Sequence, residues 1–243
     1  MSTGRQTTPW WMWLLGGCGC LTLVVTVSFV GLGWMGFKWA KQTAETMSDP
    51  AKRADAARAR FGMEALPEGW HPAAVFSVPM FADIVVLADR VADEPTVDGG
   101  VEPRVDGASQ ALIFASVRDI GGQREKWRTA LESGTDPKST GVQLPVGFGS
   151  SAFAKGSFGM GENDVTWAAY YGNLDHQEQQ RSIPARVAAA LVECPNHPRV
   201  ELVAWAVPMR EGDTQTGAEA GLPGDENALR GLLELFPVCP GGG

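Results

Sequence analysis

The stretch that decides the fold is ARVAAALVECPNHPRVELVAWAV, residues 185–207. It holds two apolar runs of strand length, 185–192 and 200–207, on either side of a short polar segment. Short apolar runs bounded by turn signals predict strands. The segment Cys194-Pro195-Asn196-His197-Pro198 is typical of a turn, because proline and asparagine favour turn conformations. The stretch therefore predicts two neighbouring strands joined by a turn.

Working outward from this stretch, four further segments have the length and the apolar, β-branched composition of strands. They are residues 73–78, 84–88, 111–117 and 165–171. Helical spacing of apolar residues predicts helices at 123–132 and 226–235. Neighbouring strands outnumber strand–helix–strand units, so we expect an α+β domain over residues 63–243. It should hold a mainly antiparallel sheet of about six strands and two or three packed helices.

A helix is also predicted just before this domain. Asp49 suits the N-cap and Pro50 the first helical position, residues 51–61 are rich in Ala and Arg, and Gly62 can close the helix. Residues 38–62 are interpreted as a helical stalk between the domain and what precedes it.

Residues 10–37 contain no charged side chain, and these 28 positions exceed the roughly 20 that an α-helix needs to cross a bilayer. A cleavable signal peptide would have a shorter apolar core and a small-x-small cleavage site. Aromatic side chains, which favour the membrane–water interface, stand near both ends of the run: Trp10, Trp11, Trp13, Trp34 and Trp39. We expect a single transmembrane helix in the cell (inner) membrane after a polar tail of residues 1–9, with the lipid bilayer as a partner.

Cys18 and Cys20 lie inside this apolar run. Leu15-Gly16-Gly17-Cys18 resembles a bacterial lipoprotein box, but the strongly apolar residues 21–30 follow where a lipoprotein has a polar tether. The small residues around the two cysteines can instead let a second helix approach closely. Self-association or contact with another membrane protein through this helix is therefore an open expectation.

The charge distribution bears on partners and on compartment. Residues 64–243 carry 13 Lys/Arg and 25 Asp/Glu, a net charge of −12, which disfavours nucleic acid as a partner. Basic residues after the apolar run favour a cytoplasmic domain, although this rule weakens for long domains. Cys194 and Cys239 are the only cysteines after the run, and such a pair suits a disulfide outside the cytoplasm. We expect this disulfide and an extracytoplasmic domain, with a cytoplasmic domain as the alternative.

The sequence contains only weak motifs for catalysis, cofactor binding or metal binding. Residues 147–152, GFGSSA, fit a dinucleotide-binding pattern, but the glycines that follow oppose the helix that such a site needs. Residues 133–162 are interpreted as a long glycine-rich loop. Cys194, His197 and Cys239 could supply three zinc ligands, a weaker reading than the disulfide. Strand alternation is taken to place Trp205 inward and Glu201 outward. No catalytic, cofactor-binding or metal-binding residue is assigned.

The sequence thus predicts a membrane-anchored binding or structural module of the cell envelope, with no cofactor. Two alternatives stay open: a membrane-tethered enzyme with a site near residues 133–162, and a cytoplasmic, membrane-tethered adaptor.

Overall fold

A computed structural model describes residues 41, 43–95, 101–104, 107–140, 144, 146–176, 181–210, 213 and 217–239. Residues Glu45–Gly243 form one compact unit and Met1–Ala44 another. The predicted transmembrane helix of residues 10–37 and its tryptophans lie outside the described residues. Within the described residues, no helix has the length and apolar character needed to span a membrane.

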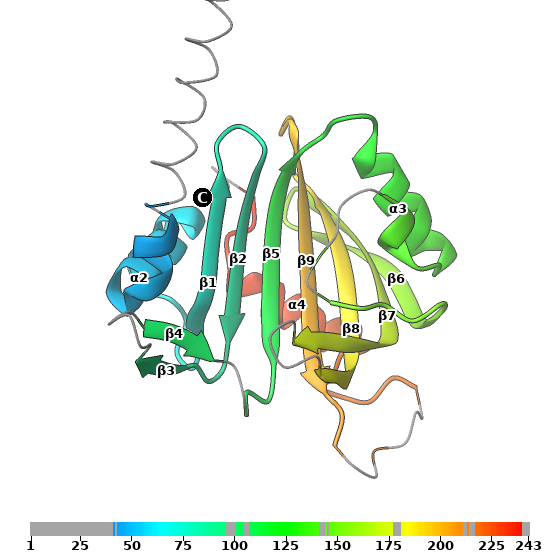
Figure 1. Cartoon of the computed structure of the whole chain (residues 1–243). Helices are drawn as coiled ribbons and strands as arrows, with labels where there is room; N and C mark the ends of the chain where they lie inside the picture. Colours follow the sequence, from blue (N-terminus) through cyan, green and yellow to red (C-terminus); the bar gives the residue numbers. More distant parts are fainter. Residues whose placement is uncertain are drawn as a thin grey trace, which may run out of the picture. The chain divides into compact units, whose positions relative to one another are not determined.

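The domain is built on a seven-stranded sheet in which every neighbouring pair is antiparallel. The strands lie in the order β1-β2-β5-β9-β8-β7-β6 (Figure 1). Their bounds are β1 His71–Val78, β2 Ala82–Ala88, β5 Ala111–Arg118, β6 Ala152–Met160, β7 Asn163–His176, β8 Arg181–Glu193 and β9 Arg199–Pro208. Six of these contain the six predicted strands, so the α+β prediction with an antiparallel sheet is confirmed.

The quoted stretch forms β8, the turn and β9 at the centre of this sheet. Side chains alternate between its two faces, and both faces are buried, which is why the two runs are nearly continuously apolar. On β9, Val203 and Trp205 face one core, while Leu202 and Ala204 face the other.

Helices cover the two faces unequally. The helices α2 (Pro50–Phe61) and α4 (Glu226–Glu234) pack on the face that carries Trp205. The helix α3 (Gln123–Ser133) packs on the opposite face, against β6, β7 and β8. Figure 1 shows α3 over the β6–β8 side of the sheet, with no helix in front of β1, β2 and β5. This uneven cover leaves part of one sheet face open.

Helix α2 has the predicted capping residues, but it packs on the domain instead of forming a stalk. The Asp49 carboxylate accepts a hydrogen bond from the N–H of Ala51 at 2.9 Å, and Gly62 ends the helix with a φ of 65°. However, Ala57 and Phe61 are buried in the core beside the sheet. The interpretation of residues 38–62 as a stalk outside the domain is therefore wrong for α2, because its apolar face is needed to cover the sheet.

The interpretation of residues 133–162 as one irregular loop is also wrong. A short 3₁₀ helix (Pro137–Thr140) lies in this range, and β6 pairs with β7 from Ala152 to Met160, with a register shift between Ala152 and Ala154. Lys155 of β6 donates hydrogen bonds from Nζ to the carbonyl oxygens of Glu132 and Ser133, at 2.7 and 3.1 Å. The strand is thus attached to the C-terminal end of α3.

A second, smaller sheet lies between β2 and β5 in the chain. It consists of two short antiparallel strands, β3 (Ala92–Pro95) and β4 (Val101–Arg104). Asp93 of β3 pairs with the buried Arg53 of α2. The hairpin therefore helps to hold α2 on the domain.

Candidate binding surface

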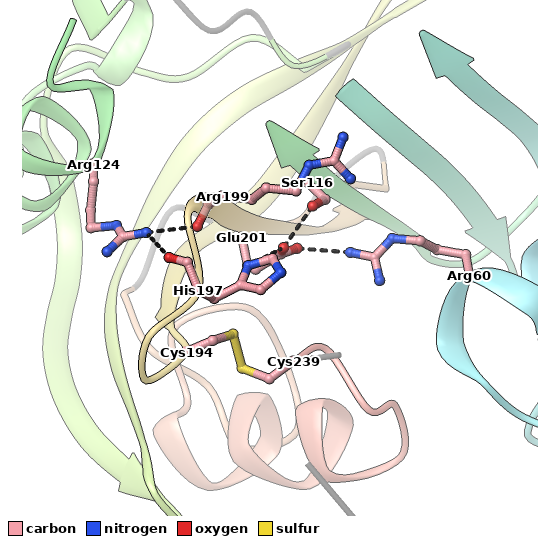
Figure 2. Close-up of a disulfide and its surroundings, with 8 residues drawn as sticks. All are labelled: Arg60, Ser116, Arg124, Cys194, His197, Arg199, Glu201 and Cys239. Atoms are coloured by element: carbon pink, nitrogen blue, oxygen red, sulfur yellow. Dashed lines mark hydrogen bonds and ion pairs between the residues drawn. A yellow bond between two sulfur atoms is a disulfide. The ribbon is translucent and has the colours of Figure 1, made fainter. Parts of the chain in front are cut away.

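The structure joins Cys194 and Cys239 by a disulfide, with their Cα atoms 5.6 Å apart. Cys194 follows β8 and opens the turn to β9, and Cys239 follows α4, as Figure 2 shows. The predicted disulfide is confirmed. Because both cysteines are bonded to each other, neither is a thiolate ligand for the zinc site considered as the weaker interpretation. Its position indicates a structural role, because it ties the segment after α4 to the central hairpin.

Beside the disulfide lies a buried carboxylate. Glu201 is 1% exposed and accepts a hydrogen bond from the Ser116 hydroxyl at 2.6 Å and from the Arg60 guanidinium at 2.8 Å. His197 Nδ1 lies 3.4 Å from Oε1 of the same carboxylate. Figure 2 shows these side chains converging on Glu201 from α2, β5 and the β8–β9 turn.

The prediction that Glu201 points outward is wrong. Glu201 and Trp205 are four residues apart on one strand, so period-two alternation places them on the same face. Burial of an ionised carboxylate is tolerated here because a guanidinium and a hydroxyl supply its hydrogen bonds. The arrangement holds the end of α2 on the sheet, and the hydroxyl of Ser116 donates to the same carboxylate.

The turn between β1 and β2 carries an exposed apolar surface, which we name the apolar tip. Its members are large apolar side chains that are at least 40% exposed: Phe76, Val78, Met80, Phe81 and Ile120. The backbone N–H of Arg118 donates to the carbonyl of Phe81 at 2.8 Å, which brings the end of β5 to this turn. The tip stands at the uncovered side of the sheet, at the upper end in Figure 1.

The tip is presented by an unusual turn residue. Met80 has a φ of 67°, in the left-handed region that asparagine and glycine adopt more readily than methionine does. Its side chain is 75% exposed, so packing does not explain why methionine stands there. A strained backbone that displays a flexible apolar side chain is a feature of recognition surfaces.

The glycines of the dinucleotide-like pattern have a packing role. Gly147 forms an isolated bridge with Asn173 of β7. A Cβ on Gly149 would lie 2.3 Å from the carbonyl oxygen of Tyr171, and a Cβ on Gly172 would lie 2.0 Å from that of Gly147. These positions need glycine because two backbones cross closely, and no helix follows them for a pyrophosphate to meet.

Two of the titratable groups with a shifted pKa have structural roles. Burial raises the pKa of Tyr170, which lies in the core under α3 and donates to the carbonyl of Thr135 at 3.0 Å. The backbone N–H of Gly221 lowers the pKa of Asp225, the N-cap of α4. Among the described side chains, no group of three or more His, Cys, Asp or Glu could hold a metal ion.

Sequence reasoning did not single out the apolar tip. The signal was present, because Val78-Pro79-Met80-Phe81 places large apolar residues where a turn between strands normally carries polar ones. The range 133–162, near which the alternative enzyme reading places a site, contains β6 and the close crossing of Gly149 with β7.

Comparison with known proteins gives distant structural neighbours. No family model and no curated protein matches the chain. A solved structure of a mutant of the protein Mog1 is 15% identical, with a TM-score of 0.36, over 71% of this chain and 85% of that chain. The Saccharomyces cerevisiae Ran-binding protein Mog1p is 14% identical, with a TM-score of 0.30, over 60% of this chain and 71% of that chain. Similarity at this level assigns neither a family nor a function.

Proposed function

We propose that this chain is a membrane-anchored module of the cell envelope that binds a partner protein through the apolar tip. The observation that carries the proposal is the exposed group of Phe76, Val78, Met80, Phe81 and Ile120 at one end of a rigid sheet. Large apolar side chains exposed near the same end of ordered strands are typical of interaction sites. Met80 has the most exposed side chain of the five, at 75%.

The anchoring part of the proposal rests on the uncharged residues 10–37 and their terminal tryptophans. The extracytoplasmic placement is supported by the disulfide between Cys194 and Cys239, since disulfides persist mainly outside the cytoplasm. In this proposal the membrane segment holds the domain at the bilayer, and the tip selects the partner.

Charge supports a partner of a particular kind. With a net charge of −12, residues 64–243 repel anionic lipid headgroups and also a second copy of the domain. An apolar groove with a basic rim on a different protein would complement both the tip and the net charge of the domain. The proposed partner is therefore a protein with such a groove, rather than the bilayer surface or another copy of this chain.

Site-specific photo-crosslinking in cells tests this function. A photoreactive residue placed at position 81 in the full-length chain should give one discrete protein adduct of a mass different from twice the chain. The matched control carries the same residue at position 235, because Leu235 is also an exposed large apolar residue, 47% exposed, but lies at the end of α4. That control should give no such adduct.

A second change links the adduct to the tip. Met80→Ser in the crosslinking chain should abolish the adduct while leaving the membrane fraction and the melting temperature of the domain nearly unchanged. Lipid adducts alone, adducts of twice the chain mass, equal adducts from positions 81 and 235, or an adduct that survives Met80→Ser would each reject the proposed function.

A further inference from the structure

A pocket of about 770 Å³ lies on the sheet face opposite to α3, near the ends of β8 and β9 that are distant from the disulfide. Its walls come from the residues before β5, the last residues of β9 and the segment 219–222. This volume is in the range of small-molecule binding sites, which hold a few polar groups among apolar ones. No part of the apolar tip lines it.

The floor of the pocket combines a cation with an aromatic plane. Arg186 and Trp205 line it, and each is 4% exposed. The indole N–H of Trp205 donates to Oε1 of Gln110 at 3.2 Å, which fixes the ring. Val207 adds an apolar wall.

Arg186 is unexpected at this position. It stands in β8 before Val187 and three alanines, a run that is otherwise entirely apolar. A buried guanidinium must be paired, and an apolar side chain of similar volume is often as stabilising in such a place. The positive charge of Arg186 is therefore better explained as a binding group for an anionic ligand that enters the pocket.

The chain supplies one such anion itself. Arg186 donates to Oε1 of Glu219 at 2.7 Å, and this bond raises the pKa of the guanidinium. Glu219 does not belong to the sheet: it lies on the segment between β9 and α4, and its side chain is 48% exposed. An exposed carboxylate can exchange its place with another one, because water solvates it when it leaves.

We propose that the Arg186 pocket binds a small organic carboxylate with a flat apolar body, and that Glu219 occupies the carboxylate position when the ligand is absent. The ligand carboxylate takes the bond from Arg186 that Glu219 makes, and the flat body lies on Trp205 and Val207. Glu219 then acts as an internal competitor that sets the affinity.

Titration calorimetry with phenylacetate as the probe tests the pocket in the purified full-length chain in detergent. Glu219→Gln should bind phenylacetate at least tenfold more tightly than the wild type, because the competitor has lost its charge. Glu193→Gln is the matched control: Glu193 also pairs with an arginine, Arg128, but far from the pocket. It should bind as the wild type does.

Two further measurements make the test specific. Arg186→Lys retains the positive charge but loses the planar fork, and in the Glu219→Gln background it should weaken binding at least tenfold. The uncharged analogue phenylacetamide should not bind to Glu219→Gln. Equal affinities of wild type and Glu219→Gln, no binding to either, binding that Arg186→Lys leaves unchanged, or equal binding of the amide would each overturn the proposal. The crosslinking result at the tip does not depend on any of them.

Discussion

Ser116 and Glu201 face each other across the β5–β9 ladder, and the serine hydroxyl donates to the buried carboxylate at 2.6 Å. This contact lies where one half of the sheet, β1, β2 and β5, meets the other half, β6 to β9. Arg60 reaches the same carboxylate from α2, at 2.8 Å. One side chain thus connects a helix near the start of the domain with two central strands.

Glu201→Ala should therefore lower the free energy of unfolding by about 3 kcal/mol, because it leaves the largely buried Arg60 guanidinium without this partner. Glu193→Ala at the other end of the same turn should lower it by less than about 1 kcal/mol, since its pair with Arg128 is partly exposed. Denaturant unfolding of the two variants measures the difference. Equal losses of unfolding free energy in the two variants would show that burial of Glu201 does not increase its contribution to stability.

Cys239→Ser should destabilise the domain by about 4 kcal/mol at most, the chain-entropy value for the 45-residue separation of the bridged cysteines. The disulfide restricts the unfolded chain, so its loss favours unfolding. The oxidised domain should also migrate faster on a non-reducing gel than on a reducing one. Alkylation during denaturing lysis without reductant should leave Cys194 and Cys239 unlabelled, and labelling of both would contradict the bond.

Met80→Gly should raise the free energy of unfolding by about 1 kcal/mol, because glycine adopts a φ of 67° without the steric penalty that methionine has. The comparison is Ile120→Gly, which removes a tip side chain at a position without a positive φ and should not stabilise the domain. Thermal unfolding measures both. A destabilised Met80→Gly would show that the methionine side chain supports the turn.

Alkaline pH should destabilise the domain through Tyr170. Its pKa is raised by burial in the folded state, so the unfolded chain releases this proton first. The contribution to stability is present below about pH 10, the ordinary tyrosine pKa, and is lost as the pH rises above it. Tyr170→Phe should cost about 1 kcal/mol at neutral pH through the lost bond to Thr135 and should flatten the alkaline decline.

Low pH should also destabilise the domain, through the carboxylate of Asp225 at the N-cap of α4. The backbone N–H of Gly221 has the largest effect and lowers the pKa of Asp225; desolvation acts in the opposite direction, and the N–H groups of Asn227 and Ala228 lower the pKa further. A lowered pKa stabilises the fold above the unfolded value, near pH 4, and this stability is lost as the pH falls below it. Asp225→Asn should show a shallower decline between pH 5 and about pH 2. An unchanged acid limb would contradict the assignment.

Local patterns allowed most of the sheet to be predicted. The runs 185–192 and 200–207 are long, apolar and separated by a proline-rich turn, so their strand character needs no tertiary information. Strand β6 was missed because Gly156 and Gly159 have low strand propensity. Gly156 is explained only by the folded state, where a Cβ would lie 3.1 Å from Nε1 of Trp167.

The candidate sites could not be predicted from the sequence in the same way, because they depend on residues that are far apart in the chain. Glu201 has a partner 141 residues away in Arg60, and no spacing rule connects two such positions. Arg186 stands in an apolar strand, and its partner Glu219 lies on a segment without a pattern of its own. The apolar tip depends on which part of the sheet α3 leaves uncovered, and that is decided by the assembled layers.

The order of strands in the sheet has a consequence for the kinetics of folding. β1 and β2 are joined by one turn, and β6 to β9 follow one another along the chain. Of the ladders in the seven-stranded sheet, the β5–β9 ladder, which pairs Arg118 with Arg199, closes the longest segment of chain. Loop closure of this length slows folding more than a hairpin does. We therefore expect β6 to β9 to assemble early as a local unit, with Cys194 and Cys239 both on its side of the ladder. Oxidation of the cysteines can then precede the docking of β1, β2 and β5, and the joining of the two halves would be the slow step.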